Sequence, residues 1–289
     1  RREFLTRATA FGVTAPAAYA LIGSAKPVEA AGHAQMGGTL RVQMAVRAMK
    51  EPRLYDWSEI GNTTRGWFEH LASYERDGSI VPVLLEGWDV SEDAKEYTLR
   101  LRPGVKWNNG DDFVADHVIY NIEKWCDSSV EGNSMASRFG AIMDADTGKL
   151  RDGAVVKTDD LTVKMMLSEA DISLIATMTD YPACIVHPDT NYADPMDNPI
   201  GTGPYLPDSH SVGEKTVIVR NENHTWWNEG NGAYFDRIEY IDYGTDPASW
   251  MAAFEAEEVD MSYQSTGEFI DILTDMGFVK SEVATAATL

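Results

Sequence analysis

An alternating strand is the clearest pattern in the chain, between residues 97 and 102. Leu99 and Leu101 alternate with two arginines at a period of two, which predicts a strand with one buried face. Pro103-Gly104 ends the alternation, and Val105–Trp107 predicts a second short strand before a turn at 108–111. We therefore expect two neighbouring strands, the first with its leucines in a core.

An amphipathic helix follows this turn. After Phe113 the apolar positions are Val118, Ile119, Ile122 and Trp125, which share one face of a helix. The hydrophobic period thus changes from two to about 3.6 within a short stretch. We expect this helix to pack against the strand that precedes it.

Shorter patterns alternate strands with helices along the rest of the chain. Strands are predicted near 39–44, 80–88, 155–167, 182–186, 217–220, 235–241 and 279–283. Helices are predicted after the cap residues 62–64, over 135–143, over 172–178 and from Asp246-Pro247. The first of these would carry Trp67, Phe68 and Leu71 as an apolar stripe, which we expect to be core.

Charge narrows the range of partners. The chain has 289 residues, enough for a sizeable core, and a formal net charge of -22. Such a surface repels phosphate backbones and anionic membranes, so nucleic-acid binding is not expected. Attraction of cationic ligands and adaptation to salty surroundings both remain open as reasons for the acidity.

The first residues are typical of an export leader. Arg1-Arg2 followed by Phe-Leu matches the twin-arginine pattern, and a mildly apolar segment, Ala8–Ile22, comes next. Small residues near Ala30 and Ala34 offer cleavage sites, so we predict a leader over residues 1–34. The segment is too short and too weakly hydrophobic for a stable membrane span. The alternative is an amphipathic helix of the mature protein, which its proline and glycines would weaken.

The sequence does not decide whether the two cysteines form a disulfide. Cys126 and Cys184 are 58 residues apart, a spacing that does not fix geometry. In an oxidising compartment they could pair, and two separate buried thiols are equally compatible with the sequence. Neither lies in a lipid-attachment context near the leader, which favours a periplasmic protein over a lipoprotein.

Several motifs, in the same order along the chain, resemble one family. They are Leu101–Trp107 with Gly110 and Ala115-Asp116, then Asn198–Tyr205, and then Asn221–Trp227. The set is similar to the signature of the family 5 extracellular solute-binding proteins, the oligopeptide and dipeptide receptors of ABC importers. Asn109, Val114, His117 and Glu257 depart from the family pattern. Gly201 and Gly203 make a tight turn that could hold an anion or brace the fold, and we favour the brace.

The resemblance implies a fold and its divisions. It implies an α/β, periplasmic binding protein type II-like, two-lobe (Venus-flytrap) fold, of which this sequence carries mostly the first lobe with an extra small subdomain. The larger subdomain is expected over 35–68 and again over 181–282, and the small subdomain over 69–180. Residues 283–289 are expected to start the crossing into a second lobe.

The resemblance also places a candidate ligand-binding stretch after the first strand. In oligopeptide relatives an extended ligand pairs its backbone with this region. The matching residues here are Tyr55, Asp56, Trp57 and Ser58. A carboxylate beside a large aromatic side chain suits a cationic group or an amino terminus, although an ordinary surface loop has the same composition.

A second candidate group lies in a loop that relatives extend into their cleft. Its members are Ser134, Met135 and Arg138. Arg138 could pair with a ligand carboxylate, or it could be a surface arginine with local partners. Lys106, Asp116 and His117 are expected to brace the small subdomain instead of touching solute.

The implied function is solute capture. We expect a periplasmic, monomeric substrate-binding component that delivers oligopeptides, dipeptides or similar extended solutes to an ABC importer permease. The alternatives are the same receptor fold binding an oligosaccharide, a nickel chelate or an opine-like solute, and an exported hydrolase. The sequence shows no His-Glu-x-x-His, Gly-x-Ser-x-Gly or paired-histidine metal spacing. This absence is weak evidence alone, but together with the export leader and the family resemblance it leads us to expect no catalytic residue, no metal and no cofactor.

Overall fold

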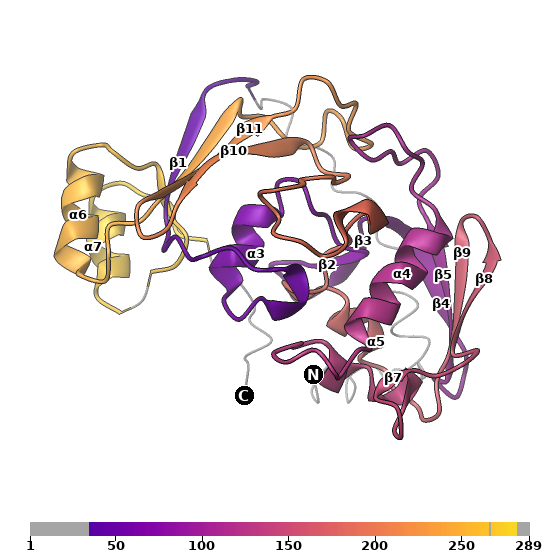
Figure 1. Cartoon of the computed structure of the whole chain (residues 1–289). Coiled ribbons are helices and arrows are strands. Elements are labelled where there is room, and N and C mark those ends of the chain that lie inside the picture. Colours follow the sequence, from indigo (N-terminus) through magenta and orange to yellow (C-terminus); the bar gives the residue numbers. More distant parts are fainter. Residues whose placement is uncertain (1–34, 266, 282–289) are drawn as a thin grey trace, which may run out of the picture.

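Two separate sheets form the frame of the molecule. The computed structural model describes residues 35–265 and 267–281. The larger sheet has five strands, in the spatial order β10 (Tyr205–Ser211), β11 (Lys215–Arg220), β12 (Arg237–Ile241), β1 (Thr39–Gln43) and β13 (Met261–Ser262). Figure 1 shows this sheet set apart from a smaller four-stranded sheet, with helix α3 (Ser58–Thr64) between them.

Three neighbouring strands of the larger sheet are parallel to one another. β1 pairs in parallel with β12 on one side and with β13 on the other, while β10 and β11 are antiparallel. The carboxyl ends of β1, β12 and β13 therefore meet at one edge, where ligands of α/β proteins usually bind. The chain from residue 44 to α3 starts at this edge.

The smaller sheet contains the predicted strand and helix. Its order is β4 (Leu85–Val90), β5 (Glu96–Leu101), β9 (Thr162–Met166) and β8 (Val155–Asp159), all antiparallel. Leu99 and Leu101 are buried as the alternation requires, and helix α4 (Ala115–Trp125) buries Val118, Ile122 and Trp125. Both predictions are confirmed.

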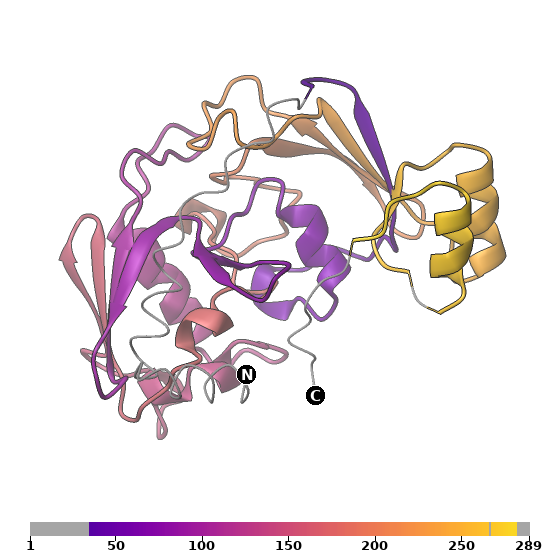
Figure 2. The ribbon, with the colours of Figure 1, turned by 180° about the vertical axis from the view of Figure 1, so that it is seen from behind.

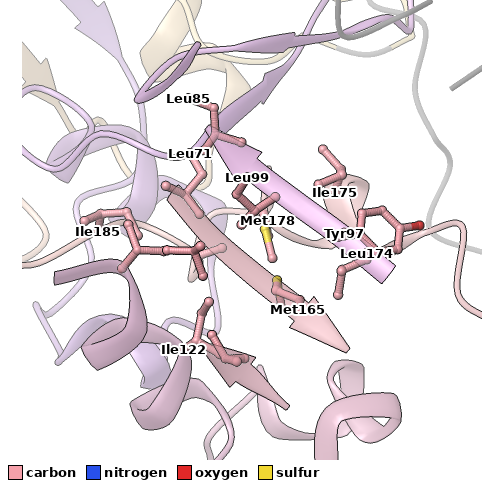
Figure 3. Close-up of a cluster of buried hydrophobic side chains, with 14 of the residues drawn as sticks. Leu71, Leu85, Tyr97, Leu99, Ile122, Met165, Leu174, Ile175, Met178 and Ile185 are labelled. Carbon is pink, nitrogen blue, oxygen red and sulfur yellow. The ribbon is translucent and has the colours of Figure 1, made fainter. Parts of the chain in front are cut away.

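One core joins this sheet to the helices beside it. Figure 3 shows Leu99 and Met165 on the strands among Leu71, Ile122 and Leu174 from other parts of the chain. Burying one such side chain contributes about 1.5–3 kcal/mol. The predicted second strand, Val105–Trp107, is only a single bridge between Lys106 and Asp112.

His117 has a bracing role in this unit. Its Nδ1 accepts the indole N–H of Trp107 at 3.0 Å, and the backbone N–H of Val114 lies at 3.5 Å. Lys106 pairs with Asp112 at 2.5 Å, and Asp116 with Lys157 at 2.7 Å. The expected brace is therefore present in the contacts of all three residues.

The helix predicted after residues 62–64 is wrong. α3 ends at Thr64, and the hydroxyls of Thr63 and Thr64 donate back to the carbonyls of Glu59 and Ile60. After α3 the backbone pairs with a distant segment instead of continuing the helix, because Gly66 O accepts from the N–H of Tyr205. The predicted stripe of Trp67, Phe68 and Leu71 is nevertheless core, since all three are at most 1% exposed.

The glycine turn predicted as a brace packs directly against this backbone. Gly203 N–H donates to Trp67 O at 3.0 Å, and Gly201 O accepts from Asn108 N–H at 2.9 Å. A Cβ on Gly201 would lie 1.9 Å from Trp67 O, so no larger residue fits without movement. The turn joins the small sheet to the segment that follows α3.

Two other predicted elements are shorter than expected. Residues 135–143 form two 3-10 turns instead of a helix, and 182–186 forms a single bridge between Cys184 and His70 instead of a strand. The remaining short elements are η1 (Pro52–Leu54), β2 (Ala72–Tyr74), β3 (Ile80–Pro82), η2 (Ala136–Arg138), η3 (Gly140–Ile142), β6 (Met143–Asp144), β7 (Lys149–Leu150), α5 (Leu174–Thr177) and η4 (Pro188–Thr190).

A helix pair lies at one end of the larger sheet (Figure 2). α6 (Pro247–Glu255) is capped as predicted, since Asp246 Oδ1 accepts from the N–H of Ala248 at 3.0 Å. Glu257, where the family pattern has glycine, takes a φ of 56°. α7 (Phe269–Asp275) follows, residues 279–281 are in no strand, and the rest of the strand predicted there lies outside the described residues.

Both cysteines are buried free thiols, and burial raises the pKa of each to about 12. None of the helices in the described ranges is both long and apolar enough to cross a membrane. The predicted leader, residues 1–34, and the predicted crossing, residues 283–289, lie outside the described residues.

Candidate functional site

Tyr55 belongs to the core. It is 0% exposed, it packs with Trp67, Phe68 and Tyr192, and its hydroxyl donates to Thr64 Oγ1 at 3.2 Å. Burial raises the pKa of this phenol well above its usual value. Its ring therefore fixes the start of α3 and presents no surface to a solute.

Asp56 and Trp57 lie on the surface beside it. Asp56 pairs with Lys50 at 2.6 Å, and this bond lowers the pKa of the carboxyl group. Trp57 is 50% exposed, and the guanidinium of Arg47 lies 4.2 Å from its ring centroid. An exposed tryptophan beside charged groups is a common feature of binding surfaces.

Ser58 brings in a residue that sequence reasoning missed. Its Oγ accepts from the hydroxyl of Tyr263 at 3.0 Å, and Tyr263 is 38% exposed. Tyr263 comes directly after β13, and its N–H donates to Gln43 O at the end of β1. The parallel pairing of β1 with β13 thus brings Ser58 and Tyr263 together at the carboxyl edge of the sheet. We call Asp56, Trp57, Ser58 and Tyr263 the candidate face.

The second predicted group, Ser134, Met135 and Arg138, contacts the segment that precedes the candidate face. The backbone N–H and the hydroxyl of Ser134 both donate to Arg53 O, at 3.1 and 3.3 Å. Met135 is 0% exposed and belongs to the core. Arg138 pairs with Asp180. Ser134 and Arg138 are partly exposed, and Met135 is not.

Tyr181 links the two predicted groups. It is half-buried, and a Cβ on Gly61 of α3 would lie 2.6 Å from Tyr181 Cβ. Burial raises the pKa of its phenol most, with Asp180 adding to the effect, Arg138 opposing it, and Asp56 and Glu59 adding smaller contributions. No sequence signal indicates Tyr181, because its position depends on the packing of residues 180–186 under α3.

Asp111, His187 and Asp189 form a separate group of possible metal ligands, with one ligand atom of each within 4.8 Å of the others. His187 Nδ1 accepts from the N–H of Asp189 at 3.2 Å, and its Nε2 lies 3.1 Å from Asp111 Oδ2. Both nitrogens are used, which is the pattern of a structural brace between the turn at Asp111 and η4.

An apolar cavity of about 220 Å³ lies between α6 and α7. It is bounded by Ser262 and Gln264, the neighbours of Tyr263.

Comparison with known proteins identifies relatives. The model of the bacterial extracellular solute-binding proteins, family 5 Middle, matches residues 79–288. The chain is 26% identical over 216 residues to the nickel-binding periplasmic protein of Escherichia coli K12, covering 69% of this chain and 36% of that protein. It is 31% identical over 156 residues to di/tripeptide-binding protein 1 of Pseudomonas aeruginosa, covering 48% of this chain and 29% of that protein. The chain thus spans about a third of the length of these curated relatives.

Solved structures share the fold. The periplasmic binding protein DppA of Helicobacter pylori in complex with the peptide STSA gives a TM-score of 0.67 at 21% identity, covering 83% of this chain and 49% of that one. OppA of Haemophilus influenzae in complex with the peptide RPPGFSPFR gives a TM-score of 0.68 at 17% identity, covering 84% and 50%. The α/β fold described above is therefore that of the type II periplasmic binding proteins.

Proposed function

Because the chain belongs to family 5 of the bacterial extracellular solute-binding proteins, we propose that it is part of a receptor delivering peptides to an ABC importer. The observation that carries the proposal is the candidate face, where the exposed Trp57 precedes Ser58, and Ser58 is hydrogen-bonded to the exposed Tyr263 at the carboxyl end of β13. Three of the proteins named above carry di/tripeptide binding or a bound peptide in their descriptions.

Capture in such a receptor requires enclosure. A solute bound at the candidate face would be removed from water when a second surface closes over it, which strengthens its hydrogen bonds and signals occupancy to the permease. The aromatic side chains of Trp57 and Tyr263 would supply contact area at small entropic cost. Chemistry on the solute is not part of this role.

The ligand-binding residues predicted from the sequence have different roles in solute capture. Asp56, Trp57 and Ser58 would contact the solute together with Tyr263. Tyr55 and Met135 would hold the surface in place from the core, and Ser134 would anchor its loop to Arg53. Arg138 would contact a solute only by sharing or leaving its bond with Asp180, so we assign it a secondary role.

Location and partners follow from the same proposal. We propose that residues 1–34 direct export by the twin-arginine route, and that the mature protein works as a periplasmic monomer. Replacing Arg1-Arg2 with two lysines should retain the precursor in the cytoplasm, detected by fractionation and immunoblotting. Export unchanged by that replacement would assign the leader to another route.

The direct test is to identify what the protein carries. Native protein purified without denaturation should release peptides on acid precipitation, detected by mass spectrometry. The Trp57→Ala variant should release much less, and the matched variant Val212→Ala, which removes another exposed apolar side chain, should release as much as wild type. Release of oligosaccharide, metal chelate or opine-like solute would replace peptides as the substrate, and turnover of a peptide library would contradict the receptor role.

A further inference from the structure

Arg47 lies over the Trp57 ring of the candidate face. Its guanidinium carbon lies 4.2 Å from the centroid of the Trp57 ring, and both side chains are exposed. Stacking of a planar guanidinium on an indole fixes the plane of the cation and leaves its N–H edges pointing away from the ring.

Those edges have no partner in the described part of the chain. Two other stacked arginines there are satisfied, since Arg53 donates two bonds to Glu51 and Arg102 donates to the carbonyls of Val83 and Leu85. Arg47 makes the same kind of ring contact without a hydrogen bond or ion pair to any described residue. It is therefore an oriented donor group with nothing to donate to.

The charge beside Arg47 is already balanced. Lys50 and Asp56 neutralise each other at 2.6 Å, so Arg47 leaves this small surface positive in a chain whose net charge is -22. An incoming ammonium group would meet two cations, Arg47 and Lys50, beside a single carboxylate that both of them already stabilise. An incoming carboxylate would displace neither, and it matches the two parallel N–H donors of a guanidinium edge.

Resting on the proposed function, we propose that Arg47, positioned by Trp57, binds a carboxylate of the solute. The substrate class is therefore solutes with a free carboxylate, such as peptides with an unblocked carboxyl terminus. This reverses the polarity expected from Asp56 and Trp57 alone, which suited an amino terminus. Arg47 would determine specificity because loss of the carboxylate leaves a guanidinium enclosed without a partner.

Three tripeptide probes separate these polarities by isothermal titration calorimetry. They are N-acetyl-trialanine, which has only the carboxylate, N-acetyl-trialanine amide, which has neither charge, and trialanine amide, which has only the ammonium. Wild type should bind the first at least about tenfold more tightly than the second. Arg47→Ala should reduce that ratio to about one, Arg47→Lys should give an intermediate ratio, and the melting temperature should stay unchanged in both.

Arg76 provides the matched control. It is an exposed arginine in the turn between β2 and β3, so Arg76→Ala removes one positive charge elsewhere and should leave the ratio at its wild-type value. Equal affinity of wild type for acid and amide, or a ratio that survives Arg47→Ala, overturns the carboxylate anchor. If only trialanine amide binds, the carboxylate anchor is overturned and the peptide-receptor proposal stands. If none of the three probes binds, the result counts against both proposals.

Discussion

The four-stranded sheet and the candidate face are built in opposite ways. In the sheet, Leu99 and Met165 are 0% exposed and belong to one apolar core with Ile122 of α4. On the face, Trp57 is half exposed, and its neighbours are a cation, a carboxylate and a hydroxyl. The first region is held by packing, and the second keeps polar groups available at the surface. Substitutions in the two regions should therefore change different measurements.

The core of the sheet should give the largest loss of stability. Leu99→Ala removes a side chain that is 0% exposed, so the cavity it leaves should lower the free energy of unfolding by about 3–5 kcal/mol. Urea denaturation followed by tryptophan fluorescence measures this. Lys164→Ala, on the exposed side of β9 in the same sheet, should cost less than about 0.5 kcal/mol. Similar losses in both variants would contradict the assigned core.

The glycine brace should be nearly as sensitive. In Gly201→Ala the new methyl group would lie 1.9 Å from Trp67 O, so the two backbones must separate, at a cost of about 2–3 kcal/mol. Gly140→Ala is the control, since a Cβ there meets nothing within 4 Å. Thermal denaturation of the two variants should differ by several degrees, and equal melting temperatures would show that residue 201 is not in close contact.

Acid should weaken the junction between the two regions through His70. His70 Nε2 lies 3.0 Å from Asp180 O, and burial lowers the pKa of the imidazole from 6.5 to about 3. Between these values the unfolded chain binds a proton that the folded protein does not, so stability falls as the pH falls below 6.5. The expected slope is about 1 kcal/mol per pH unit.

The variant His70→Gln isolates this contribution. Its unfolding free energy, measured in urea at pH 7, 6, 5 and 4, should fall less steeply with acid than that of wild type. Parallel curves for the two proteins would mean that another group accounts for the acid sensitivity.

The smallest effect is expected at the end of α6. Glu257 has a φ of 56°, a left-handed conformation that glycine adopts without the steric cost of a Cβ. Glu257→Gly should therefore raise the free energy of unfolding by about 0.5–1 kcal/mol, a gain that chemical denaturation can resolve. A loss of stability would indicate that the carboxylate has a role that outweighs the backbone preference.

The sequence predicted the packed regions well because their patterns are local. Alternation in β5 and the helical spacing in α4 each depend on residues close in the chain, and both elements formed as expected. The helix placed after residues 62–64 failed because Gly66 and Trp67 pair with Gly203 and Tyr205, which no local pattern reveals. A strong local period thus predicted β5 and α4, while the segment after α3 was decided by a distant partner.

The candidate face was predictable only in part, for the same reason. The resemblance located Tyr55 to Ser58, but composition could not show that Tyr55 turns into the core while Trp57 faces solvent. Tyr263 joins the candidate face because β13 pairs with β1, and this pairing joins segments that are far apart in the sequence. Glu69 is a further example, since its buried carboxylate accepts the indole N–H groups of Trp226 and Trp227, at 3.1 and 2.8 Å, from far along the chain.

The most direct test of the solute-binding role of the candidate face is the affinity of Trp57→Ala for a peptide that co-purifies with wild type. Isothermal titration calorimetry should show binding at least about tenfold weaker, because the exposed ring would be a central contact. The melting temperature should change by less than about 2 °C, since Trp57 contributes little to the core. Val212→Ala should match wild type in both measurements. Wild-type affinity in Trp57→Ala would contradict the account and place the solute elsewhere on the receptor.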